Sequence, residues 1–388
     1  MKSFKHIVPP LRLFQGADSL DKLGAELDRL KSSRAVVFCG STLGRSALLD
    51  LVKNSAGDRI AGVYTGVRAN SPVPAVQDAA NELKRLNADS VIALGGGSAI
   101  VTARAAAILM AEGGDVRSLC TRPDGAGKLH SPKLLKPKLP QLVIPTTPTT
   151  ASIKAGSALL DPTAGERLAL YDPATRARVV LIHPEFLKTP PRELIVSAGV
   201  NTLVLAVEGL MSKSGDPISD ALLIHAIRLL VKHLRTASQS DDLDVRADLM
   251  MASILCGHGS DYTGAGIAIP LGHAIGAKFH VDNGISDTIV LPQVLQFNAP
   301  ASRSGIDNIA VALGLEPTHE ASTVAAVVSA FRALFKELGM PRRLRDVGVT
   351  RDSLRELADV SINDWYMQNN PRKVQDATEL EQILEQAW

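Results

Sequence analysis

A change of hydrophobic period near residue 183 is the feature that most constrains the fold of this 388-residue chain. Before that point, short apolar runs alternate with segments of helical period, which predicts a parallel sheet covered by helices on both faces. The apolar runs occupy residues 34–40, 60–67, 90–94 and 141–147. After that point every segment with a clear pattern has helical period. We therefore predict an α/β domain over residues 1–182 and an all-helical domain over residues 183–388.

The charge balance and the cysteines narrow the classes of function. Lys and Arg number 42 against 40 Asp and Glu, which gives no electrostatic attraction to nucleic acid or to an anionic membrane. The first ten residues lack the apolar core of a signal peptide, and no run of about 18 apolar residues predicts a membrane span. Three scattered cysteines indicate neither a disulfide framework nor a cysteine metal site. We expect a cytoplasmic protein.

A glycine turn stands between a predicted strand and a predicted helix, in the segment "ALGGGSAI". Gly95, Gly96 and Gly97 allow backbone N–H groups to approach a ligand closely, and a helix N-terminus favours negative charge. The turn therefore predicts a pyrophosphate site, in which Ser98 either caps the helix or donates to a phosphate oxygen. The alternative is a tight strand–helix turn that binds nothing.

A threonine cluster, "IPTTPTTAS", follows the last apolar run of the first half. Ligands of parallel sheets bind beyond the carboxyl ends of the strands, so Thr146, Thr147 and Thr150 can face the same ligand as the glycine turn. The alternative is a turn whose hydroxyls satisfy their own backbone. The lysine-rich stretch 122–140 just before it allows phosphate steering, although a solvated loop is the ordinary interpretation.

These segments together resemble the iron-containing (group III) alcohol dehydrogenase superfamily, which is related to dehydroquinate synthase. "GGGSAIVTARAAA" is similar to GGGSxxDxAKxxA, and "IPTTPTTAS" is similar to IPTTAGTGSE. The long segment "GHAIGAKFHVDNGISDTIVLPQVLQFN" is similar to HPLGAxxxxxHGxxNAxxLPxVxxFN. "GVYTGVRANSPVPAVQDAA" and the C-terminal "NNPRKVQDATELEQILEQAW" lean toward the maleylacetate reductase branch.

The resemblance implies a Rossmann-like N-terminal domain, an all-helical C-terminal domain, and a cleft for nicotinamide cofactor and substrate. It also implies hydride transfer between NAD(P) and an alcohol or aldehyde carbon, and favours a homodimer. On this basis the residues from Gly95 to Ser98 hold the pyrophosphate, and Thr146, Thr147 and Thr150 line the cofactor.

The family's metal ligands are missing from this chain. "SAGVNTLVLAVEGLMS" resembles AGxDAxxHxxExxxS, whose Asp and His bind the metal together with two further His. The four positions here read Asn201, Leu205, Ile269 and Asn283. Aliphatic side chains have no lone pairs, and two neutral amides cannot offset a divalent charge. We expect no metal at this place.

A further family histidine is kept as His273, four residues after Ile269 and on the same helical face. In the family this histidine lies near the nicotinamide and assists proton movement. We predict that His273, or His280 in its place, donates the proton, and that Asn201 and Asn283 hold the substrate oxygen. The alternative is a packed helical histidine with a satisfied hydrogen bond.

The first strand–helix turn, "VVFCGSTLGRS", bears on the choice of cofactor. Many NAD-selective members of the family carry an Asp here, which binds the adenosine ribose and repels a 2′-phosphate. The position is Gly40 in this chain, followed by Ser41 and Thr42, so we predict that NADP is accepted, in place of or alongside NAD. The alternative is that Ser41 or Thr42 only caps its helix.

The leading hypothesis is a metal-independent, NAD(P)H-dependent reductase of a small carbonyl compound or of an oxo-acid such as maleylacetate. Two alternatives remain: a lyase like dehydroquinate synthase that uses NAD, and a dinucleotide-binding homologue without catalysis. Steady NAD(P)H turnover would exclude the binding protein, and stoichiometric cofactor consumption would exclude the lyase.

Overall fold

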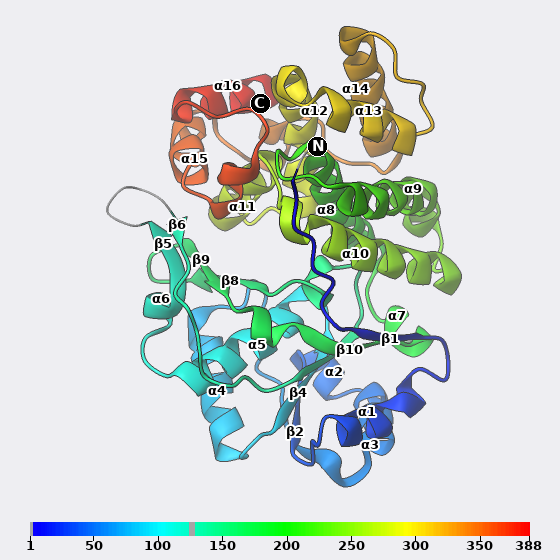
Figure 1. Ribbon diagram of the computed structural model, residues 1–388, viewed down its shortest axis with the longest axis vertical. Helices are drawn as coiled ribbons and strands as arrows, with labels where there is room; N and C mark the ends of the chain where they lie inside the picture. The colour runs from blue at the N-terminus through cyan, green and yellow to red at the C-terminus, as the bar shows by residue number, and fades with distance from the viewer. Residues whose placement is uncertain (1–2, 124–128) are drawn as a thin grey trace. The chain divides into compact units, whose positions relative to one another are not determined.

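A six-stranded, fully parallel sheet organises the first of two structural units, Pro9–Pro190 (Figure 1). The computed structural model describes residues 3–123 and 129–388. In sheet order the strands are β1 (Arg12–Gln15), β10 (Ala177–Ile182), β7 (Gln141–Pro145), β4 (Ser90–Gly95), β2 (Ala35–Phe38) and β3 (Ile60–Tyr64). Every residue of β2, β4 and β7 is buried, as expected for central strands that are covered on both faces.

Helices cover both faces of this sheet. Alternate strand residues such as Val37, Ile92 and Leu142 share an apolar cluster with α1 (Leu23–Arg29) and α3 (Ala47–Ala56). The residues between them point to the other face, where α5 (Gly97–Glu112) packs on β4 and α4 (Val73–Arg85) packs on α5. The predicted α/β architecture is therefore confirmed.

A small antiparallel sheet, which the sequence analysis missed, joins this unit. Its order is β6 (Leu129–His130), β5 (Cys120–Pro123), β9 (Glu166–Tyr171) and β8 (Gly156–Asp161). β8 and β9 form a hairpin in which the Asp161 carboxylate accepts hydrogen bonds from the backbone of Thr163 and Ala164. The hairpin follows the threonine cluster directly along the chain.

The lysine-rich stretch 122–140 is more than a solvated loop. The Lys138 ammonium is buried and lies 2.6 Å from a Glu112 carboxylate oxygen and 3.0 Å from an Asp172 carboxylate oxygen. This lysine is therefore held in an internal ion-pair cluster, where it is not free to steer a phosphate. Lys128 lies outside the described residues.

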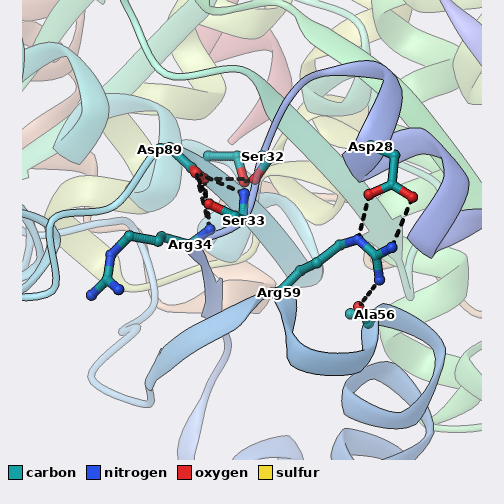
Figure 2. Close-up of polar contacts among 8 residues, drawn as sticks. Asp28, Ser32, Ser33, Arg34, Ala56, Arg59 and Asp89 are labelled. Atoms are coloured by element: carbon teal, nitrogen blue, oxygen red, sulfur yellow. Dashed lines mark hydrogen bonds and ion pairs between the residues drawn. The ribbon is translucent and has the colours of Figure 1, made fainter.

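The amino ends of the strands are tied together by charged hydrogen bonds (Figure 2). Asp89, just before β4, accepts hydrogen bonds from the backbone N–H groups of Ser33 and Arg34, just before β2. Arg59, just before β3, forms a bidentate pair with Asp28. Burial would raise the pKa of Asp89, but hydrogen bonds from Ser32, Ser33 and Arg34 outweigh it and hold this pKa below its usual value.

The second unit is helical and comprises Pro191–Trp388 with the N-terminal segment that ends at Val8. Its main helices are α8 (Arg192–Met211), α9 (Pro217–Gln239), α10 (Leu243–Thr263), α11 (Ala268–Phe279), α12 (Asn283–Asn298), α13 (Arg303–Ala312), α14 (Glu320–Glu337), α15 (Leu354–Ser361) and α16 (Ala377–Ala387). Residues 191–388 are all described and contain no strand, as the helical period predicts. The boundary between the units falls at 190/191.

The central helix of this unit is α8, which packs against α9, α10, α11, α12 and α13. By length and composition alone it could cross a membrane, but 83% of its most apolar window is buried among the other helices. It therefore occupies the position of a core helix.

Candidate functional site

Three loops meet at the carboxyl edge of β2, β4 and β7. β4 and β7 pair up to Gly95 opposite Pro145, and the N–H of Thr146 then donates to the carbonyl of Gly95 at 3.1 Å. β2 pairs with β4 on its other side, with Phe38 opposite Ala93. The glycine turn, the threonine cluster and the "CGST" turn are therefore neighbours, at the edge where parallel sheets bind ligands.

The glycine turn and the threonine cluster form one surface. Gly95 has a φ of +143°, which L side chains rarely adopt. A Cβ atom added to Gly96 would lie 2.9 Å from Oγ1 of Thr147, and one added to Gly97 would lie 3.3 Å from Oγ1 of Thr149. Only glycine lets the threonine hydroxyls come this close to the backbone at the start of α5.

Thr149 was not among the threonines selected from the sequence. Its hydroxyl accepts a hydrogen bond from the N–H of Ala151 and caps the short helix that begins at Thr150. Thr146 and Thr147 are buried, and Thr150 is half-buried. The interpretation of the cluster as a self-satisfying turn therefore holds for Thr149, while the cofactor contacts of Thr146, Thr147 and Thr150 stay a prediction.

Ser98 does not cap α5. The helix begins at Gly97 with Gly96 as N-cap, and none of the described side chains caps it. The capping role predicted for Ser98 is wrong, because Ser98 is already the second helical residue; its role as a phosphate donor stays a prediction. An uncapped first turn leaves backbone N–H groups directed out of the helix, which is the arrangement that binds phosphates.

A strained loop at residues 70–71 contacts the first turn of α5. Asn70 and Ser71 have successive positive φ angles of 60° and 46°, which cost about 1–3 kcal/mol each. The Ser71 hydroxyl donates to the carbonyl of Ser98 at 3.1 Å and accepts from the Thr102 hydroxyl at 3.0 Å. No sequence pattern predicts this contact, because Ser71 lies in a loop 27 residues before Ser98.

Arg104 fixes the segment that follows the threonine cluster. This side chain is fully buried in α5 and donates to the backbone carbonyls of Ala151 and Gly156. Burial, together with the nearby charge of Arg176, lowers the pKa of Arg104 to about 9. Arg104 thus ties the end of the threonine cluster and the start of β8 to α5.

The turn after β2 leaves room for a ligand. Gly40 is the N-cap of α2 (Ser41–Gly44), and none of the described side chains caps this helix. The alternative in which Ser41 or Thr42 caps it is therefore wrong. A Cβ atom added to Gly40 would meet nothing within 4 Å, and Ser41 and Thr42 are exposed. Both hydroxyls are thus available as donors at the edge of the sheet.

In the second unit, glycines bring α8, α11 and α12 into close contact. A Cβ atom on Gly284 would lie 2.1 Å from the carbonyl oxygen of Ser197 in α8. One on Gly272 in α11 would lie 1.9 Å from Oδ1 of Asp287 in α12. This packing is where the resemblance places the metal of the family.

The residues at those positions do not fit a divalent metal. Leu205 and Ile269 are 6% and 5% exposed and belong to the apolar core of the helical unit. The Asn201 amide donates from Nδ2 to Oδ2 of Asp287 at 2.7 Å, and Asn283 begins α12 with its Oδ1 turned toward Gly276. Two aliphatic side chains and two neutral amides supply neither the charge nor the donors that such an ion requires.

His273 is held by a carboxylate that the sequence analysis did not find. Its Nδ1 lies 2.8 Å from Oδ2 of Asp364, and both side chains are largely buried. The ring also lies beside Trp365 and Tyr366, with centroids 5.5 and 6.2 Å away. The Nδ1–H bond to Asp364 leaves Nε2 for another partner.

His280 lies at a different kind of position. It is the C-cap of α11, with a φ of 57°, and its side chain is exposed. His273, by contrast, lies inside α11 in a polar and aromatic setting. Both histidines stay candidate proton donors, but only His273 is oriented by a buried carboxylate.

Glu208 holds the beginning of the helix that carries His273. Its buried carboxylate accepts hydrogen bonds from the backbone N–H groups of Gly266, Ala268 and Ile269. Burial raises the pKa of Glu208 to about 7, although these N–H groups act in the opposite direction. The carboxylate thus serves as the N-terminal partner of α11.

Comparisons with known proteins agree with this architecture. Residues 10–184 match the family model described as "Iron-containing alcohol dehydrogenase", and residues 195–388 match "Fe-containing alcohol dehydrogenase family, C-terminal". The chain is 29% identical to lactaldehyde reductase of Escherichia coli over 95% of each chain. It is 26% identical to the NAD-dependent methanol dehydrogenase of Bacillus methanolicus over 98% of each.

Maleylacetate reductase of Burkholderia cepacia is similar to the same degree, with 28% identity over 97% of this chain and 95% of the relative. A crystal structure of 1,3-propanediol oxidoreductase superposes over the whole of both chains with a TM-score of 0.91 at 23% identity, which shows the shared fold. Maleylacetate reductase is thus one of several relatives with similar identity. The comparisons do not favour the maleylacetate reductase branch over the others.

Proposed function

We propose, from the premise that the chain belongs to the iron-containing alcohol dehydrogenase family, that it is a metal-independent reductase of small carbonyl compounds or oxo-acids. The family and its named relatives establish an oxidoreductase that uses a nicotinamide cofactor. The metal independence, the proton donor and the acceptance of NADP are the finer parts of this proposal.

The carboxyl edge of the parallel sheet supplies the cofactor site in this proposal. Gly95, Gly96 and Gly97 present backbone N–H groups to the pyrophosphate, and Thr147 contributes a hydroxyl beside Gly96. A bound nicotinamide supplies the hydride. Gly40, Ser41 and Thr42 receive the adenosine ribose without a carboxylate, so a 2′-phosphate is accepted.

The single observation that carries metal independence is the set of side chains between α8, α11 and α12. Leu205 and Ile269 have no donor atoms, and the Asn201 amide is engaged with Asp287. Neutral hydrogen bonds then hold the substrate oxygen in place of a Lewis acid, at some cost in electrostatic stabilisation. Asn283 and the second amide hydrogen of Asn201 are the donors proposed for it.

His273 is the proposed proton donor. Asp364 receives its Nδ1–H, fixes the orientation of the ring and leaves Nε2 to deliver a proton to the oxygen that develops negative charge during reduction. His280 stays the second candidate on the same helix. We also propose that the enzyme is a cytoplasmic homodimer that binds neither nucleic acid nor membrane, as its balanced charge suggests.

The test uses purified, chelator-treated protein. Its metal content is measured alongside oxidation of NADPH and NADH with maleylacetate, lactaldehyde and other small aldehydes. Turnover without bound metal is expected. A stoichiometric metal that turnover requires would contradict the proposal. Product formed without net cofactor consumption would favour the lyase, and cofactor binding without any turnover would favour a binding protein.

A further inference from the structure

A fully buried carboxylate connects the three helices at the place where the resemblance puts the metal. Asp287 belongs to α12, and its Oδ2 accepts a hydrogen bond from the Asn201 amide in α8 at 2.7 Å. Its Oδ1 is packed against the backbone of Gly272 in α11, since a Cβ atom there would lie 1.9 Å away. One side chain of α12 therefore contacts both other helices.

Relative to the family pattern, the residue types at the two ends of this hydrogen bond, positions 201 and 287, are exchanged. In that pattern the α8 position carries the metal-binding Asp of AGxDA, and the α12 position carries the Asn of HGxxNA. This chain has Asn201 at the first position and Asp287 at the second. The carboxylate and the amide have changed places across the contact between α8 and α12, so the pair still contains one of each.

An exchange of this kind keeps a hydrogen bond but not a metal site. A carboxylate and an amide complement each other wherever each stands, because the amide donates and the carboxylate accepts. Metal binding needs the carboxylate together with three imidazoles, and those three positions are filled by Leu205, Ile269 and Asn283. The contact between the helices is therefore kept by groups that need no ion.

We propose that the Asn201–Asp287 hydrogen bond takes the structural place of the metal, by linking α8 to α12 at the point where Asp287 packs against α11, one residue before His273. This inference rests on the proposed metal independence and extends it from the reaction to the fold. Asp287 is a positioning residue, since its side chain packs against Gly272, the residue before His273 in α11.

Because the amide and the carboxylate complement each other, the proposal can be tested by a double-mutant cycle of wild type, N201D, D287N and the double variant. Asn201→Asp alone places two carboxylates face to face in a buried contact and is expected to lower the Tm by at least about 5 °C. Asp287→Asn alone leaves two amides and is expected to lower it less. The double variant N201D/D287N restores one carboxylate and one amide and is expected to recover at least half of the loss caused by N201D.

The measurements are thermal unfolding in the presence of chelator and of added Zn²⁺ or Fe²⁺, all without substrate. Wild-type protein is expected to give the same Tm in each condition. Additive effects of the two substitutions, or a wild-type Tm lowered by chelator, would overturn the cross-link. If N201D is insoluble, a soluble double variant supports the proposal and an insoluble one overturns it.

A matched control lies in the same unit. Asn298 and Asn370 form a buried pair with reciprocal hydrogen bonds of 2.8 Å, so Asn298→Asp measures the general cost of a carboxylate in such a pair. Asp287→Asn should not rescue N298D, and rescue there would overturn the specific coupling. A positive cycle in a protein without carbonyl reductase activity would keep the cross-link and refute the proposed function. If the enzyme is active without metal but the effects of N201D and D287N on the Tm are additive, the proposed function stands and the cross-link is refuted.

Discussion

The carboxyl edge of the sheet and the contact of α8, α11 and α12 have diverged from the family pattern in different ways. The edge keeps its glycines and threonines, and its site is made largely of backbone N–H groups. The helical contact keeps the family's glycines at Gly276 and Gly284, so the helices still pack closely, but the donor side chains are gone. A site built from backbone lasts as long as the fold, whereas a site built from side chains can be lost by a few substitutions without any change of packing.

The largest effect is expected at the helical contact. His273→Ala should lower kcat by about 100-fold or more, because the ring is the proposed proton donor, and should also lower the Tm, because it leaves the buried Asp364 without this partner. Steady-state kinetics and thermal unfolding measure both quantities. The matched variant is His280→Ala, at an exposed helix end. If His280→Ala proves the more harmful of the two, the proton donor role moves to His280.

The next effect concerns the carboxylate behind His273. Asp364→Asn should lower kcat by about tenfold or more with little change in KM, because Asn keeps the N-cap of the turn at Trp365–Asn369 but no longer fixes the imidazole. Asp376→Asn, at the N-cap of α16, is the control for a cap substitution alone. A rise in KM with unchanged kcat would show that Asp364 acts on substrate binding and not through His273.

A comparable effect is expected at the edge of the sheet. Gly40→Asp should raise the KM for NADPH by about tenfold relative to that for NADH, because the carboxylate repels a 2′-phosphate and can bind the ribose. The space beside Gly40 and its extended backbone admit the side chain without strain. Gly40→Asn is the uncharged control of the same shape. If Gly40→Asp raises the KM for NADPH and the KM for NADH equally, this turn does not determine the choice between the two cofactors.

The last prediction concerns the dependence of stability on pH, and not activity. The pKa of Glu208 is about 7 in the folded protein and about 4.5 when exposed, so the folded state binds the proton more tightly. Its contribution to the free energy of unfolding is therefore greatest below about pH 4.5, falls by on the order of 3 kcal/mol between these two values, and is level above pH 7. Denaturant unfolding of wild type and Glu208→Gln from pH 4 to 8 should show this slope in the difference between them.

The control for this measurement is Glu82→Gln, on the exposed face of α4. Because the Arg85 guanidinium holds the pKa of Glu82 below its usual value, the difference from wild type should not fall as the pH rises from 4.5 to 7. A flat difference for Glu208→Gln as well would mean that the N–H groups of Gly266, Ala268 and Ile269 keep this carboxylate ionised.

Local patterns predicted the elements that carry strong periodicity. Strands β2, β3, β4 and β7, the helix α5 after the glycine turn and the helical second unit all lie where the sequence predicts them. β10, which lies inside the sheet between β1 and β7, was missed. The short edge strand β1 and the antiparallel hairpin of β8 and β9 were missed, because four to six residues at an exposed edge give little apolar signal. The glycine turn was found because glycine, strand and helix follow one another along the chain.

The sequence by itself determined the two fold classes, the glycine turn and the absence of the family's metal-binding side chains, since each of these is a property of neighbouring residues. Only the tertiary structure decided which distant side chains meet: His273 with Asp364 across 91 residues, and Asn201 with Asp287 across 86. The physical reason is that helix packing, and not chain proximity, fixes these contacts. A buried carboxylate must find its hydrogen-bond donor on whichever helix the packing brings beside it.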